Sequence, residues 1–169
     1  HSYKSQSMRY KLHLVLSSLL ILLVLMEACT GQRKLQKGEY EAAVNRSINK
    51  LRKSPGNKKA AKTLDQAYNL TVKTLMEEVY ALKASNEVYK WEKKITRYHK
   101  LNSISDEIAR CPACLKIIPD ANRYTSVLVE ALNNAANVRY GLGIEQMKLK
   151  TIYSAQEAYR HFLIAKSYV

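Results

Sequence analysis

Three cysteines are the residues of this 169-residue chain whose type and spacing best suit chemistry. Cys111 and Cys114 are separated by Pro and Ala, a spacing that suits a disulfide, a reactive dithiol or half of a zinc site. Zinc needs two further ligands, and neither a second Cys pair nor a neighbouring His supplies them. Thiol redox catalysis needs a βαβ fold around the pair, which the sequence does not predict. We therefore expect a local structural disulfide, with a redox dithiol as the alternative.

The third cysteine, Cys29, follows the strongest apolar stretch of the chain. Arg9 and Lys11 precede an uncharged run over residues 14–26, and the small residue Ala28 lies directly before Cys29. Charge, a short apolar run and a small residue before a cleavage point are typical of a secretory signal peptide. The run is shorter than the roughly 20 residues that a membrane-spanning helix needs. An exported chain is therefore expected, with a buried apolar helix as the alternative.

The residues before Cys29 resemble the lipobox of bacterial lipoproteins, which reads Leu, a small residue, Gly or Ala, and then Cys. Ala28 and Cys29 match this pattern, whereas Met26 and Glu27 depart from it. The resemblance implies a cleaved signal peptide over 1–28 and acyl chains on Cys29 that anchor the mature chain in a membrane. Because no Asp directly follows the cysteine, it also implies an outer membrane, with the protein facing the periplasm.

The rest of the chain is expected to form one helical domain over 38–169, joined to the lipid by a polar tether over 29–37. Residues 1–7 contain no initiator, and Met8 is a normal opening for a signal, so 1–7 are set aside as not native. The apolar end at 161–169 predicts a domain that is truncated at its C-terminus. The net charge of +14 favours acidic partners or a solvated basic surface. Nucleic acid is not expected as a partner of an exported protein.

Apolar residues recur at spacings of three and four almost throughout, and alternating β-branched residues are scarce, which predicts an all-α fold. Asp120 is expected to cap the fifth helix, Gly141 and Gly143 to end it, and residues 111–120 to form a kinked connector. The last helix is expected to split near Lys150. The predicted helices cover 40–53, 58–85, 87–102, 105–110, 120–140 and 144–169.

Two parts of the chain carry a weak repeat pattern. The first consists of Gly38, Tyr40, Ala43, Pro55, Leu64 and Tyr68. Their spacing resembles the tetratricopeptide repeat, and Ala158, Phe162 and Ala165 resemble its second helix. The resemblance implies a solenoid of helical hairpins with a protein-binding groove. Residues 70–140 do not follow the repeat, so a generic helical bundle is the alternative.

One predicted helix combines aromatic and basic residues that could form a binding face for an acidic peptide or a glycan such as peptidoglycan. These residues are Tyr89, Trp91, Lys93, Lys94, Arg97 and Tyr98. Core packing with solvated lysines is the alternative. No phosphate-binding loop, nucleophile elbow or paired His-Glu helix motif is present, so no catalytic, metal or cofactor residues are expected. The expected function is a non-catalytic envelope lipoprotein that scaffolds other envelope proteins, with a glycan-binding module or a thiol redox protein as alternatives.

Overall fold

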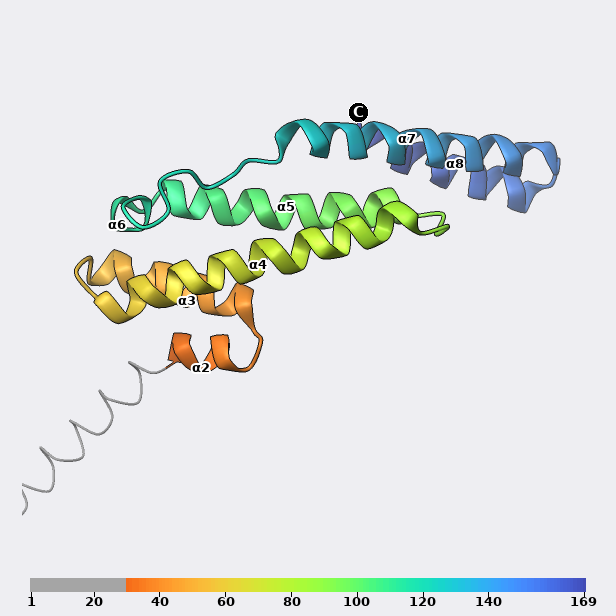
Figure 1. Ribbon diagram of the computed structural model, residues 1–169. Coiled ribbons are helices and arrows are strands. Elements are labelled where there is room, and N and C mark those ends of the chain that lie inside the picture. Colours follow the sequence, from red (N-terminus) through yellow and green to blue (C-terminus); the bar gives the residue numbers. More distant parts are fainter. Residues whose placement is uncertain (1–29) are drawn as a thin grey trace, which may run out of the picture. The chain divides into compact units, whose positions relative to one another are not determined.

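The computed structural model describes residues 30–169, and every regular element in that range is an α-helix (Figure 1). The all-α prediction is therefore confirmed. The helices form two compact units that divide between Tyr68 and Asn69, within one long helix. The predicted signal peptide and Cys29 lie outside the described residues. No helix in the described part of the chain is long and apolar enough to cross a membrane.

The N-terminal unit, residues 30–68, contains α2 (Thr30–Gln36), α3 (Tyr40–Lys53) and the first part of α4 (Lys58–Ala84). α2 packs against α3, so most of the segment predicted as a tether is helical and belongs to this unit. The apolar face of α3 and the facing side of α4 bury the core of the unit. Its most buried side chains are Ala43, Val44, Ile48, Leu51, Leu64 and Ala67.

The boundaries of α3 follow the turn residues that the sequence contains. Gly38 has a φ of +76°, a left-handed conformation that Gly adopts without steric cost, and α3 begins two residues later. The Ser54 N–H donates to the Lys50 carbonyl at the end of α3. Asn57 caps α4 by accepting a hydrogen bond from the Ala60 N–H at 2.8 Å. The predicted turn between the two helices is therefore confirmed.

The C-terminal unit, residues 69–169, contains the rest of α4 with α5 (Lys90–Ala109), α6 (Pro112–Leu115), α7 (Thr125–Lys148) and α8 (Ile152–Lys166). α7 packs against both α5 and α8. Small buried residues on α7 let it approach α5 closely. The core cluster consists of Leu75, Val79, Ile95, Tyr98, Leu101, Ala131 and Ala135.

The predicted break between helices 87–102 and 105–110 is wrong, because α5 continues through it. Ser105 was expected to cap a new helix, but it is buried within α5. Its hydroxyl group lies 3.1 Å from the Leu101 carbonyl and 2.7 Å from the Asn122 carbonyl. Since these contacts satisfy the hydroxyl inside the folded unit, Ser105 does not interrupt the helix.

The predicted break at Gly141 and Gly143 is also wrong, because α7 passes through both residues. A Cβ atom at Gly143 would lie 2.5 Å from Phe162 Cε1, whereas a Cβ at Gly141 would meet nothing within 4 Å. Gly143 thus allows α8 to pack closely against α7. Asp120 does not cap this helix either, because Tyr124 occupies the N-cap position.

The predicted split near Lys150 is confirmed. α7 ends at Lys148, and Lys150 has a φ of +54°. Thr151 then caps α8 through a reciprocal pair of hydrogen bonds with Ser154. The result is an α7–α8 hairpin with a short connection, whose two helices lie side by side (Figure 1).

Candidate functional site

Cys111 and Cys114 are joined in a disulfide at the start of α6. Both residues are buried, and the Cys114 N–H also donates to Cys111 Sγ at 3.3 Å. A reactive cysteine needs an accessible sulfur atom in an electropositive environment. The burial of both sulfur-bearing side chains favours a structural disulfide that holds the connector between α5 and α7.

Two residues of the expected aromatic and basic face pack against each other. The Lys94 ammonium lies 4.2 Å from the centre of the Trp91 ring, a cation–π contact. Lys94 is only 7% exposed, and burial lowers its pKa. The aliphatic chain of Lys94 and the Trp91 ring therefore pack within the C-terminal unit and do not form an open binding face.

The other basic residues of this group form ion pairs with acidic residues outside α5. Lys93 pairs with Glu87, and Arg97 Nε lies 2.8 Å from Glu78 Oε2. Tyr98 is buried in the core cluster, and burial raises its pKa.

The six residues do not form a single exposed face. Tyr98 stacks against Tyr124 in the core, with ring centres 6.0 Å apart. Tyr89 is the most exposed aromatic residue of the group, but Arg139 covers one face of its ring at 4.1 Å. Of the six residues, only Tyr89 and Lys93 are exposed.

A polar network that the sequence analysis did not identify joins α5, α7 and α8. Arg139 binds the Glu92 carboxylate through two hydrogen bonds, Nε to Oε1 at 2.5 Å and Nη2 to Oε2 at 2.9 Å. Its third guanidinium nitrogen lies 3.3 Å from His161 Nδ1. The Glu92 carboxylate raises the pKa of Arg139, whereas burial and then the Arg139 charge lower the pKa of His161. The Glu92 and Arg139 charges stabilise each other, whereas the Arg139 charge disfavours the protonated form of His161.

An apolar groove runs along the α7–α8 hairpin, with a volume of about 620 Å³. Exposed apolar side chains from α7 form one wall, including Tyr140 and Met147, which are 58% and 57% exposed. Phe162 and Ala165 of α8 form the other wall. Large apolar side chains gathered in one groove mark interaction surfaces more often than chance exposure.

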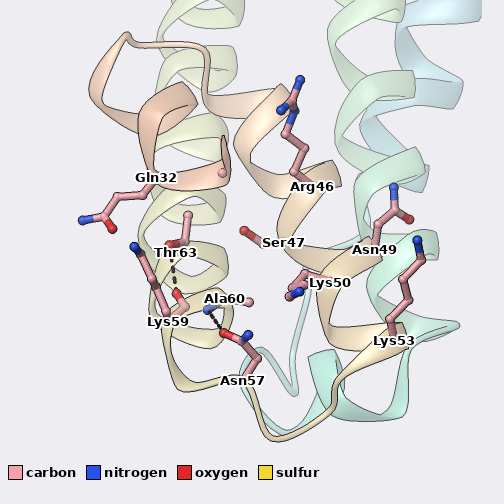
Figure 2. A pocket seen from close by; sticks show the side chains of 11 residues that line it. Gln32, Arg46, Ser47, Asn49, Lys50, Lys53, Asn57, Lys59, Ala60 and Thr63 are labelled. Carbon is pink, nitrogen blue, oxygen red and sulfur yellow. Dashed lines mark hydrogen bonds between the residues drawn. The ribbon is translucent and has the colours of Figure 1, made fainter. Parts of the chain in front are cut away.

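A second hollow, of about 300 Å³, lies in the N-terminal unit among α2, α3 and the start of α4 (Figure 2). Four of its lining residues are basic, namely Arg46, Lys50, Lys53 and Lys59. No residue that lines it is acidic. The two hollows thus differ in chemistry, one apolar and one polar and basic.

Comparison with known proteins gives this chain no relative. No protein-family model matches it, and no curated protein and no solved structure matches it significantly. Within residues 30–169, no group of three or more His, Cys, Asp or Glu side chains is placed to hold a metal ion. The disulfide, the polar network and the two hollows are the features of the described residues that bear on function.

Proposed function

We propose that this protein is a non-catalytic, membrane-anchored scaffold of the bacterial envelope that binds an apolar helix of a partner protein. The observation that carries the proposal is the α7–α8 groove, in which Tyr140, Ile144 and Met147 of α7 lie exposed beside Phe162 of α8. Burying such a surface in a complex stabilises the complex by about 25 cal/mol for each Å² removed from water.

The groove has the length and pattern that suit a helix. On α7 its lining residues recur every three or four positions, from Ala136 through Tyr140 and Ile144 to Met147. These residues span about 16 Å at 1.5 Å per residue. A partner helix of about three turns, with apolar residues at the same spacing, would fill this length.

Charge at the groove selects among such helices. Lys166 lines one wall, and none of the lining residues is acidic. We therefore expect the partner helix to carry an acidic residue beside its apolar stripe, close to the Lys166 ammonium group. Opposite charges at the rim favour the correct register and speed association.

The hairpin and the lipobox-like residues supply the rest of the proposal. Phe162 packs against Gly143 while Ala158 and Ala165 are buried, which supports a tetratricopeptide-like hairpin. Acyl chains on Cys29 would hold the groove at a membrane face, where two or more chains give stable anchoring.

Site-specific crosslinking tests the groove. A photoreactive benzoyl-phenylalanine placed at Met147 of the full chain should give a discrete crosslinked product in the native envelope. Peptide mapping of that product should place the crosslink on an amphipathic helix with an acidic residue. Adding Ile144→Glu should abolish the product, because a carboxylate would then be buried in the groove.

The same photoreactive residue at Asn133, which is exposed on α7 outside the groove, is the matched control. Products that are equal at both positions, or only uncrosslinked monomer at Met147, would overturn the proposal. A crosslinked product that contains two copies of this chain would show that the groove mediates self-association and does not bind a partner protein.

A further inference from the structure

We propose that the hollow among α2, α3 and α4 binds a ligand that carries a phosphate ester. This inference goes beyond the scaffold function, because it concerns the N-terminal unit and does not depend on the α7–α8 groove. The hollow has a volume of about 300 Å³, at the lower end of the range for small-ligand pockets. Its size suits a phosphorylated headgroup or sugar.

Positive charge surrounds the hollow from two helices. Figure 2 shows Lys50 on α3 and Lys59 on α4, whereas the charged ends of Arg46 and Lys53 extend from α3 away from Ser47. Residues 30–68 contain ten Lys and Arg but only three Asp and Glu, and none of the acidic residues lines the hollow. Cations gathered around a concave site attract anions more strongly than the same charges spread over a flat surface.

Neutral hydrogen-bond donors complete the lining. Asn57 Oδ1 accepts the Ala60 N–H as the cap of α4, which leaves the two N–H groups of the Asn57 amide free to donate to a ligand. Figure 2 places the Ser47 hydroxyl group between the α3 and α4 walls, and Ser47 is a buried polar residue.

These features suit phosphate better than a carboxylate. A phosphate ester offers two or three non-bridging oxygen atoms on a tetrahedral phosphorus, and residues with donor groups line this hollow from α3, α4 and the turn between them. Lys acts on phosphate as a point charge that needs no planar geometry, unlike the paired contact of Arg with a carboxylate.

The ester could belong to a lipid headgroup or to a soluble metabolite. Gly31 and Gln32 line the hollow and follow Cys29 by two and three positions. If Cys29 is acylated, as proposed above, the hollow lies within a few residues of the anchor and can meet a headgroup. A soluble ester would reach it without any anchor.

Titration of the full chain in neutral detergent separates these sources. The probes are glycerol phosphate, short-chain dihexanoyl phosphatidylglycerol, and dihexanoyl phosphatidylcholine as a zwitterionic control. Binding should shift the amide resonances of Ser47 and Asn57. Lys50→Gln should weaken the affinity by about tenfold, as expected for a lost charge-assisted hydrogen bond.

Lys62→Gln is the matched control, because Lys62 is exposed on α4, lies outside the hollow and carries the same charge. Saturation by glycerol phosphate that is weakened about tenfold in Lys50→Gln but not in Lys62→Gln supports a soluble ester. The same result with phosphatidylglycerol alone supports a headgroup. Binding of neither probe, or equal weakening in Lys50→Gln and Lys62→Gln, overturns the proposal. Amide spectra that match the wild-type chain without ligand verify that each variant is folded.

Discussion

The Arg139 guanidinium group pairs with the Glu92 carboxylate and lies over the Tyr89 ring. Without the carboxylate, the positive charge would be partly buried and unpaired. The Arg139 and Glu92 side chains are only 14% and 24% exposed, so water screens their ion pair weakly. The Tyr89 ring covers the guanidinium group. The pair therefore fixes the relative placement of α5 and α7 through charge as well as through packing.

Removing one partner of this ion pair should destabilise the C-terminal unit. We expect Glu92→Gln or Arg139→Met to lower the free energy of unfolding by about 2–3 kcal/mol, because each leaves one charge buried without its partner. The combined variant Glu92→Leu with Arg139→Met should lose less than either single variant, since no charge remains unpaired. Urea denaturation measures all three.

Lys73 and Glu77 provide the control for these variants, because they form an exposed ion pair at 4.0 Å on α4. Lys73→Gln should change stability by less than about 0.5 kcal/mol. An Arg139 variant that behaves like Lys73→Gln would contradict the buried-pair interpretation.

His161 should make stability depend on pH. Its pKa in the folded chain lies below the ordinary value of 6.5, because burial and the nearby Arg139 disfavour its protonated form. As the pH falls below 6.5, the unfolded chain binds a proton before the folded chain does, so stability is lost on acidification. His161→Gln should remove this part of the loss, measured by thermal unfolding between about pH 7 and pH 5. His99→Gln, at an exposed position, should keep it, and equal pH slopes in both variants would refute the assignment.

At the scale of helices, two nearby glycines provide a matched comparison. Gly143→Ala should destabilise the α7–α8 hairpin by about 1–3 kcal/mol, because the new Cβ would lie 2.5 Å from the Phe162 ring. Gly141→Ala should stabilise α7 by up to about 1 kcal/mol, because its position is open and Ala is the better helix former. Thermal unfolding of both variants measures the difference. Equal effects would mean that close packing does not explain Gly143.

The same comparison shows why some helices could be predicted and others could not. The turn between α3 and α4 depends on residues that are adjacent in sequence, so its position was predicted correctly. Local propensity alone predicts a helix break at Gly143 and at Ser105. In the structure the Phe162 ring packs against Gly143, and the Ser105 hydroxyl group contacts the Asn122 carbonyl. Such contacts between distant residues override local propensity and are not visible in one sequence.

The candidate sites follow the same rule. The disulfide joins cysteines three positions apart, so its pairing was visible in the sequence. Glu92, Arg139 and His161 are far apart in the chain, and nothing in the sequence connects them. The hollow in the N-terminal unit likewise combines lysines from two helices. The charged residues of these sites are visible in the sequence, but the sequence does not show that they lie close together in the fold.

For the whole molecule, two different forces would hold the proposed protein at a membrane, and they can be separated. Residues 30–169 contain 25 Lys and Arg against 13 Asp and Glu, so anionic lipids should attract them in a salt-dependent manner. Acyl chains on Cys29 would bind through the hydrophobic effect, which salt does not weaken.

In a bacterial host, the wild-type chain should therefore stay with the membrane fraction after a high-salt wash. Cys29→Ser should be washed off, while Cys111→Ala with Cys114→Ala should remain bound because those cysteines lie in the folded unit. Mass spectrometry of the mature N-terminus should find acylated Cys29 in the wild-type chain. A Cys29→Ser chain that resists the wash, or a wild-type chain with an unmodified Cys29, would refute lipid anchoring. The proposed binding of a partner helix in the α7–α8 groove would not be affected by that result.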